Sequence, residues 1–185
     1  RGLAISGQRT CPISKTAIKD EPTKLTKDVA RLFYVMPLAF IAITRQVLCP
    51  ILAYMMATPL TSESWFGIHV TKDEWGQCYE YLNRFRNNIA MNGDYSKYDL
   101  HFSSQLIFSV GEIFANMGQC LGYPPWAIAM IASVFSDLSN PLYAYSGTLV
   151  SFLGLMPSGN PATVAINGVG NSLLHRCFFY EYWKR

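Results

Sequence analysis

The sequence predicts an α+β fold in which helices outweigh strands. Long apolar segments with helical periodicity are the first observation behind this prediction. The second is a pair of short Tyr-, Leu- and Val-containing runs joined by Ser146-Gly147, which is typical of a β-hairpin. The third is the composition: 185 residues that are 50% hydrophobic and 15% charged can bury a substantial core and are too apolar for a disordered chain.

The first half of the chain contains two predicted helices and one strand. We expect extended segments and loop over residues 1–30, then a buried helix over 38–56 that is apolar on nearly all sides and bent near Pro50. Residues 58–69 are predicted to be loop. The capping-box sequence Thr71-Lys72-Asp73-Glu74 predicts a helix that runs to about residue 87. Residues 89–94 are predicted to form a short buried strand that ends at Asp94.

The second half is predicted to hold three helices and the hairpin. Residues 103–117 form a helix closed by Gly118, and Pro124-Pro125 begins another that reaches about residue 138. The hairpin strands cover 142–145 and 148–152. A long helix over 162–183 contains Gly168 and Gly170, which are costly there unless backbone or a ligand approaches closely.

Charge, cysteines and hydropathy narrow the functional class. Residues 1–31 carry seven basic and three acidic side chains, which is typical either of a phosphate-facing loop or of a solvated basic arm. Five scattered cysteines indicate reduced thiols and no structural zinc. The apolar run before Arg45 is too short to span a bilayer, so no transmembrane segment is predicted. Both ends of the chain look cut from a longer protein.

Two aspartates have the spacing of a carboxylate pair. Nucleotidyl transfer needs divalent ions held by carboxylates, and an aspartate at the end of a buried strand presents its side chain rigidly to such ions. Asp94 fits this description, and Asp99 follows five residues later. The spacing alone fits equally well a strand that ends at Asp94 and a helix that Asp99 caps near Leu100.

The run from Ser158 to Asn167 is far more specific. Ser158-Gly159, between two prolines, forms a loop that can rearrange while its ends stay fixed. Thr163 and Asn167 are four residues apart and share one helical face. The Asn167 amide can hydrogen-bond a ribose 2′-hydroxyl, and Asp99 can accept from it. The alternative interpretation is a capped turn followed by an incidental asparagine. Chance is a poor explanation for a match to the whole pattern.

These residues resemble the RNA-dependent RNA polymerases of picorna-like positive-strand RNA viruses. Residues 93–99 resemble the family's motif A, and residues 158–167 are similar to its motif B. Residues 17–21, followed by 30–33, resemble motif F, the basic segment over the incoming triphosphate. Details of the polar loop and helix resemble marine or algal-virus members most.

The resemblance implies a role for each matching residue. Asp94 and Asp99 are implied to be catalytic: Asp94 as a ligand of Mg²⁺ or Mn²⁺, and Asp99 as a residue that reads the ribose together with Asn167. Ser158, Gly159 and Thr163 are implied to form the mobile loop and nucleotide-sensing face. Lys19 and Arg31 are implied to contact the triphosphate, with Lys24 and Lys27 less clearly matched because Pro22-Thr23 intervene.

The resemblance also implies an architecture and partners. Residues 1–88 are expected to be a fingers segment, and residues 89–185 a partial palm with a fingers insertion between motifs A and B. The expected partners are an RNA template and primer, NTPs and the rest of the same polymerase chain, in the host cytoplasm. The family's Gly-Asp-Asp hairpin, with the second metal-binding aspartate, is absent from this sequence. We therefore expect the chain alone to be inactive.

Two other functions stay open at this stage. A reverse-transcriptase-like palm shares the chemistry, but a DNA-making palm is expected to exclude the ribose hydroxyl with a bulky side chain rather than read it with Asp99 and Asn167. A non-catalytic RNA-binding or interaction module would use the basic arm. A Gly-Asp-Asp between apolar strands in the next roughly fifty residues of the parent reading frame would favour the polymerase.

Overall fold

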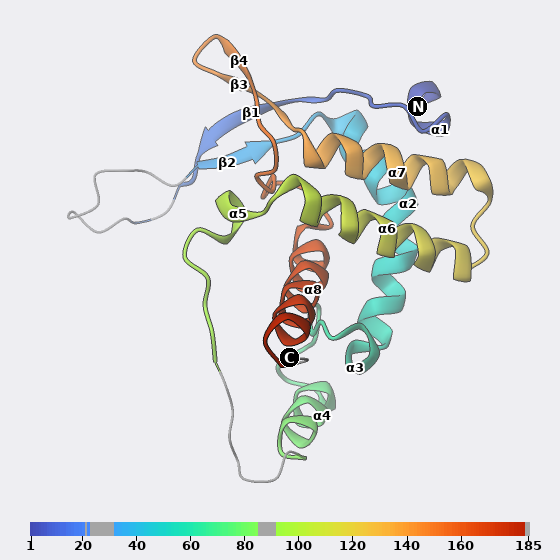
Figure 1. Cartoon of the computed structure of the whole chain (residues 1–185), viewed down its shortest axis with the longest axis vertical. Coiled ribbons are helices and arrows are strands. Elements are labelled where there is room, and N and C mark those ends of the chain that lie inside the picture. Colours follow the sequence, from blue (N-terminus) through green and yellow to red (C-terminus); the bar gives the residue numbers. More distant parts are fainter. Residues whose placement is uncertain (21, 23–31, 85–91, 184–185) are drawn as a thin grey trace.

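A computed structural model describes residues 1–20, 22, 32–84 and 92–183, and it combines a four-stranded sheet with a group of helices (Figure 1). The predicted α+β class is therefore confirmed. In chain order the elements are α1 (Gly2–Ile5), β1 (Ile13–Ile18), β2 (Leu32–Val35), α2 (Leu38–Ala57), α3 (Pro59–Ser62), α4 (Asp73–Leu82), α5 (Tyr98–His101), α6 (Ser104–Cys120), α7 (Pro125–Ser139), β3 (Leu142–Tyr145), β4 (Thr148–Ser151) and α8 (Thr163–Trp183).

The sheet joins the two ends of the sequence. Its strand order is β2-β1-β3-β4, with β1 antiparallel to β2 and parallel to β3. Ser14 lies opposite Tyr143 and Thr16 opposite Tyr34, so these side chains share one face of the sheet. The predicted hairpin is confirmed as β3 and β4. Its turn residues Ser146 and Gly147 both have positive φ, as the type I′ turn requires.

Helices α6 and α7 lie side by side and form much of the core (Figure 1). Glycine allows their close approach: a Cβ added at Gly111 would lie 2.7 Å from the Cβ of Phe135. Gly118 has the same role, because an added Cβ would lie 3.0 Å from Ile128 Cδ1. The prediction that Gly118 ends the helix is wrong, since α6 continues to Cys120.

Helix α2 is continuous through Pro50 and buries one face only. Phe40, Leu48 and Ile51 are buried, whereas Leu38 is 81% exposed, so the prediction of a helix buried all round is wrong. By length and composition α2 could cross a membrane, because it also continues through Arg45. One such helix is weak evidence, since the core helix of a soluble protein has the same properties, and α2 packs against α7.

Three local predictions in the first half need correction. Residues 58–69 contain the short helix α3 rather than loop alone, and residues 1–30 contain α1. The capping box is not formed: the N-cap of α4 is Lys72, without a side-chain bond, and Glu74 accepts instead from the backbone N–H of His69 at 2.9 Å. Residues 85–87, at the predicted end of this helix, lie outside the described residues.

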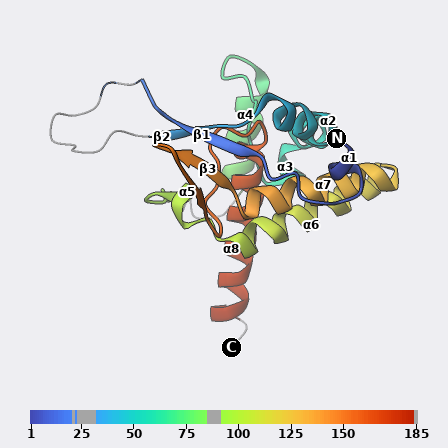
Figure 2. The ribbon, with the colours of Figure 1, turned by 90° about the horizontal axis from the view of Figure 1, so that it is seen from above.

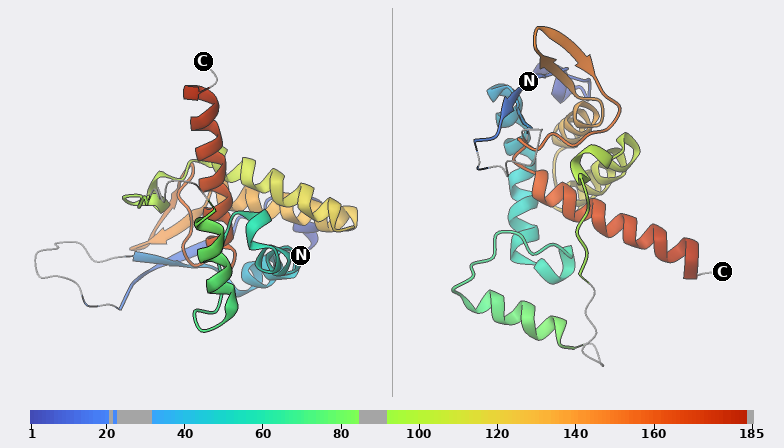
Figure 3. Two further views of the ribbon diagram at one scale, coloured as in Figure 1. Left: turned by 90° about the horizontal axis from the view of Figure 1, so that it is seen from below. Right: turned by 90° about the vertical axis from the view of Figure 1, so that its left-hand side faces the viewer.

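Helix α8 has two different halves. Its first half is buried against the core through Ala165, Ile166 and Val169. Its second half extends away from the other elements (Figures 2 and 3). There Phe179 stacks on the exposed Trp183 with an interplanar angle of 8°.

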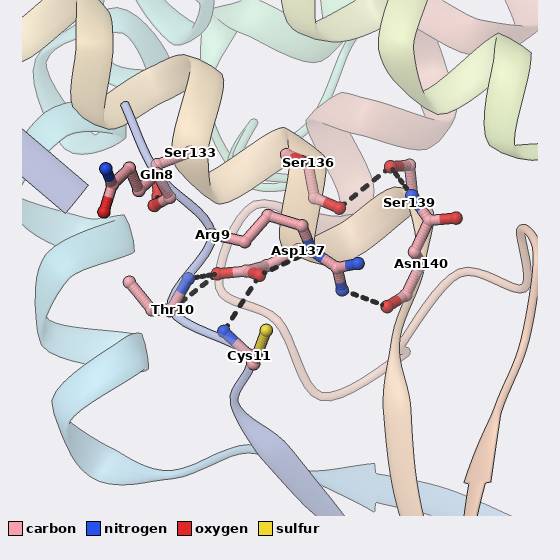
Figure 4. A network of polar contacts seen from close by, with 9 residues as sticks. All are labelled: Gln8, Arg9, Thr10, Cys11, Ser133, Ser136, Asp137, Ser139 and Asn140. Carbon is pink, nitrogen blue, oxygen red and sulfur yellow. Dashed lines mark hydrogen bonds and ion pairs between the residues drawn. The ribbon is translucent and has the colours of Figure 1, made fainter. Parts of the chain in front are cut away.

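The N-terminal segment is attached to the end of α7 by a buried carboxylate (Figure 4). Asp137 is 2% exposed and accepts hydrogen bonds from Arg9 Nε at 3.2 Å, Thr10 N at 2.9 Å, Thr10 Oγ1 at 2.6 Å and Cys11 N at 3.1 Å. Arg9 also donates to the carbonyl oxygen of Asn140 at 2.6 Å. The segment that leads into β1 is thus fixed to the segment that leads into β3.

Replacing Asp137 by Asn is expected to lower the free energy of unfolding by about 3 kcal/mol, because a buried ion pair loses one partner and the new NH₂ group cannot accept. Chemical denaturation measures the change. Glu63→Gln is the matched control. It removes a carboxylate from an exposed pair with Arg176, 2.7 Å apart, and should cost under about 1 kcal/mol. Equal losses in the two variants would contradict the role given to Asp137.

Candidate functional site

The two predicted aspartates differ in their surroundings. Asp94 is exposed in an irregular segment, so the predicted buried strand is wrong for residues 92–94; residues 89–91 lie outside the described part of the chain. Asp99 is half-buried in the first turn of α5. The N-cap of α5 is Lys97, in the left-handed conformation with φ 52°, so Asp99 does not cap this helix.

Backbone hydrogen bonds bring Asp99 beside the Ser158 loop. The carbonyl oxygen of Asp99 accepts from the N–H of Met156 at 2.9 Å, and that of Phe102 accepts from Leu155 at 2.9 Å. Met156 is fully buried and lies two residues before Ser158. The two predicted motifs, some sixty residues apart in sequence, are therefore neighbours in space.

Asn160 and Thr163 fix the far end of the loop. Asn160 is buried, and its Oδ1 accepts from the N–H of Ala162 at 2.8 Å. The Thr163 hydroxyl donates to the carbonyl oxygen of Asn160 at 2.7 Å. Thr163 thus has a local structural role at the first residue of α8, and its oxygen keeps capacity to accept a further bond.

Ser158 and Gly159 are exposed at the tip of the loop, and Gly159 lies against strand β2. A Cβ added at Gly159 would overlap the backbone carbonyl oxygen of Tyr34. A residue with a side chain therefore cannot occupy this position unless the loop or the strand moves. The loop touches β2 at a point where only glycine fits.

Asn167 lies one turn after Thr163 on the same face of α8. Its side-chain Oδ1 is buried, and no described residue donates to it. Its backbone carbonyl oxygen accepts from the hydroxyl of Tyr98 at 3.2 Å. Tyr95 donates to Asn171 Oδ1 at 2.9 Å, one turn further along. The Asp94–Asp99 segment is thereby attached directly to the helix that carries Asn167.

Glycines in α8 are explained by side-chain contacts. A Cβ at Gly170 would overlap the ring of Phe102, and one at Gly168 would overlap Ser64 Oγ. The close approach that the sequence requires is therefore made by side chains of the chain itself. Phe102 directly follows α5, so Gly170 allows the Asp99 segment to pack against α8.

Tyrosines surround Asp99, and the sequence analysis did not identify them. Burial and then the Asp99 charge raise the pKa of Tyr34. Burial, Tyr34 and Asp99, in that order, raise the pKa of Tyr143, whose hydroxyl is buried without a partner in the described structure. Burial and then Tyr95 raise the pKa of Tyr98 to about 12. The Tyr95-x-x-Tyr98 spacing beside Asp99 was the available sequence signal.

The predicted triphosphate residues are described only in part. Lys19 is exposed and directly follows β1. Arg31, Lys24 and Lys27 lie outside the described residues. Strand β2 begins at Leu32, which pairs with Ile18. Lys19 therefore lies at the end of the β1–β2 pair from which the chain connects the two strands.

Asp94 is the residue that the sequence predicts to bind a metal ion. No group of three or more His, Cys, Asp or Glu side chains within residues 1–20, 32–84 and 92–183 is placed to hold a metal ion. Mg²⁺ is commonly held by one or two carboxylates together with water and substrate phosphates. Asp94, exposed at the start of the site, fits the part of one such ligand.

The free energy of unfolding is expected to fall as pH rises from about 10 through about 12, because Tyr98 has a raised pKa and must stay neutral to donate to Asn167. Below pH 10 its contribution is complete. In Tyr98→Phe, stability at neutral pH should be lower by about 1 kcal/mol, and the alkaline decline shallower. Denaturation at a series of pH values measures both. Parallel declines in the two proteins would contradict the assignment.

Comparison with known proteins covers nearly the whole chain. Residues 6–185 match the family model described as viral RNA-dependent RNA polymerase. The replicase polyprotein of Drosophila C virus is 25% identical over 182 residues, which is 92% of this chain and 10% of that protein. The RNA1 polyprotein of Beet ringspot virus is 28% identical over 162 residues, 87% of this chain and 7% of that protein. The genome polyprotein of Avian encephalomyelitis virus (strain L2Z) is 25% identical over 159 residues, 84% of this chain and 7% of that protein.

Proposed function

The chain belongs to the RNA-dependent RNA polymerases of picorna-like viruses, and on this basis we propose that it forms the nucleotide-binding part of a polymerase active site. It spans a tenth or less of the length of the three relatives compared above. Similarity to the marine or algal-virus group stays a prediction. The observation that carries the proposal is the hydrogen-bonded contact of the Asp99 segment with both the Ser158 loop and the Asn167 backbone.

In this proposal residues 1–88 belong to the fingers, and residues 89–185 form part of the palm with a fingers insertion. The helices α6 and α7, between the two site segments, correspond to that insertion. The β1–β2 hairpin meets the second region through β1–β3 pairing. Packing of sequence-distant segments around Asp99 supports this division.

We propose that Asp99 and Asn167 recognise the ribose of the incoming nucleotide. The buried Asn167 Oδ1 accepts no hydrogen bond from any described residue, and a ribose 2′-hydroxyl supplies a donor if the loop opens. Asp99 is half-buried beside the loop, so its carboxylate can accept from the same sugar. Exposed Ser158 and Gly159 would form the moving part, and Thr163 the fixed start of the helix.

Asp94 is proposed to bind Mg²⁺ or Mn²⁺, and Lys19 and Arg31 to bind the triphosphate. When bound, the ions would neutralise phosphate charge and activate the primer hydroxyl. The exposed carboxylate of Asp94 is accessible to a hydrated ion with its phosphates. Because the described residues hold no complete metal site, we propose that this chain alone does not synthesise RNA.

The partners in this proposal are an RNA template and primer, NTPs and the rest of the same polymerase chain, acting in the host cytoplasm. Two other functions are outcomes of the tests. A non-catalytic RNA-binding module would bind RNA without synthesis, and a reverse-transcriptase-like palm would prefer dNTPs. Asn167 Oδ1 accepts no hydrogen bond within the described part of the chain, which favours a substrate that carries a 2′-hydroxyl.

Replacing Asp94 by Asn in the full-length polymerase is expected to reduce primer extension roughly a hundred-fold or more, because a metal ligand stabilises the transition state by several kcal/mol. RNA binding, measured by fluorescence anisotropy, should change little. Asp73→Asn, an exposed carboxylate in the first turn of α4, is the control and should keep full activity. Undiminished synthesis by the Asp94 variant would refute the metal role.

Asn167→Ala should reduce the preference for NTPs over dNTPs by about ten-fold, because the ribose hydroxyl loses its hydrogen-bond acceptor. Steady-state kinetics with matched NTP and dNTP substrates measure this ratio. Asn116→Ala, an exposed asparagine on α6, is the control. An unchanged ratio would exclude Asn167 from ribose recognition while leaving the polymerase assignment intact.

A further inference from the structure

Strand β2 and the residue that follows it contact the segment 159–160 at two points. The backbone carbonyl oxygen of Tyr34 lies against Gly159, where a Cβ does not fit. Two residues later, the buried Met36 places its Sδ 3.7 Å from Asn160 Nδ2. The loop therefore lies against the backbone of β2 at Gly159.

The side chain of Tyr34 extends this contact to β3. Its ring centroid lies 4.2 Å from that of Tyr143, with an interplanar angle of 35°. Tyr143 is 1% exposed, pairs with Ser14 across the sheet and also contacts Phe152 at 5.6 Å. The ring of Tyr34 thus packs against the buried ring of Tyr143, which belongs to a strand of the same sheet.

The same strand is continuous with the proposed triphosphate-binding segment. Leu32 begins β2 immediately after Arg31, and it pairs with Ile18, which precedes Lys19. β1 and β2 are paired from Lys15–Val35 to Ile18–Leu32, so Tyr34 and the end of the hairpin belong to one hydrogen-bonded element. Tyr34 lies two residues from that end of the hairpin.

The charge of Asp99 acts on both rings, since it raises the pKa of Tyr34 and of Tyr143 after burial. The ring pair therefore lies beside the carboxylate assigned to the ribose. Tyr34 thus contacts the loop and the neighbouring strand and lies near the Asp99 carboxylate.

We propose that Tyr34 is a positioning residue that couples the triphosphate-binding hairpin to the ribose-binding loop, so that NTP binding and ribose discrimination depend on each other. This inference rests on the proposed function. The ring supplies the packing against Tyr143, and the backbone supplies the surface for Gly159. With the ring removed, β2 loses its packing against Tyr143 on β3, and the backbone surface that it offers to Gly159 is held less firmly.

The test uses Tyr34→Leu in the full-length polymerase, with kcat and KM measured separately for NTPs and dNTPs. We expect KM for NTPs to rise about ten-fold and the NTP-over-dNTP preference to fall by a similar factor, because small misplacements of bound groups have large kinetic costs. Values for dNTPs should change less, because dNTPs share the triphosphate contacts with NTPs but lack the 2′-hydroxyl that makes the ribose contacts. Tyr34→Phe keeps the ring and should restore both quantities to within about two-fold.

Tyr145→Leu is the matched control, because Tyr145 is a tyrosine of β3 that is 53% exposed at the hairpin end. It should leave the discrimination ratio unchanged. A purely structural role for Tyr34 predicts a lower kcat for both substrate classes, unchanged KM values and an unchanged ratio, and this result would overturn the inference. If Tyr34→Leu does not fold, Gly159→Ala displaces the same contact from the other side and is judged by the same ratio.

The outcomes separate this inference from the proposed function. A wild-type protein that cannot extend a primer refutes the polymerase proposal itself. A wild-type protein that extends and discriminates, together with a Tyr34→Leu variant of unchanged ratio, refutes only the coupling role.

Discussion

The placement of the whole sheet depends on the buried carboxylate of Asp137. It sits at the end of α7, immediately before β3, and accepts from three consecutive residues that precede β1. A buried charge with four donors is strongly localised, because moving any donor leaves it uncompensated. The parallel pairing of β1 with β3, which would otherwise require two distant segments to find one register, begins from this point.

The candidate site is built outward from that sheet in successive contacts. β1 pairs with β2; Tyr34 of β2 and Met36, just after the strand, contact the Ser158 loop. From the other side, Phe102 packs into the space left by Gly170 and fixes the Asp99 segment on α8. Asp99 therefore reaches its position through the helical core, while the loop tip reaches its position through the sheet.

Features that depend on local sequence were predicted well. The helices α2, α6, α7 and α8 and the β3–β4 hairpin follow from apolar periodicity and turn chemistry within short windows. The motif segments around Asp99 and Ser158 were also found from sequence, and the hydrogen bond from Met156 to Asp99 confirms that they adjoin. Local patterns were enough because each helix, and the hairpin, makes backbone hydrogen bonds within itself.

Features that depend on distant contacts were missed. The sequence predicts that Gly118 ends a helix, but its lack of a side chain instead allows close contact with Ile128 on α7. The sequence predicts Glu74 as a capping-box residue, yet its carboxylate accepts a hydrogen bond from the N–H of His69 instead. The Tyr34–Tyr143 pair joins strands over a hundred residues apart, and no local pattern indicates it.

The freedom of the Ser158 loop is limited by how its ends are held. Before it, Met156 is buried and bonded to Asp99; after it, Asn160 is buried and bonded to Ala162 and Thr163. Pro157 is also buried and its carbonyl oxygen accepts from Thr163, so Ser158 and Gly159 form the exposed tip, and a movement of this tip changes the contact of Gly159 with Tyr34. In the proposed site, a nucleotide that moved this loop would first displace its contact with β2, so the strand would take part in the response to the nucleotide.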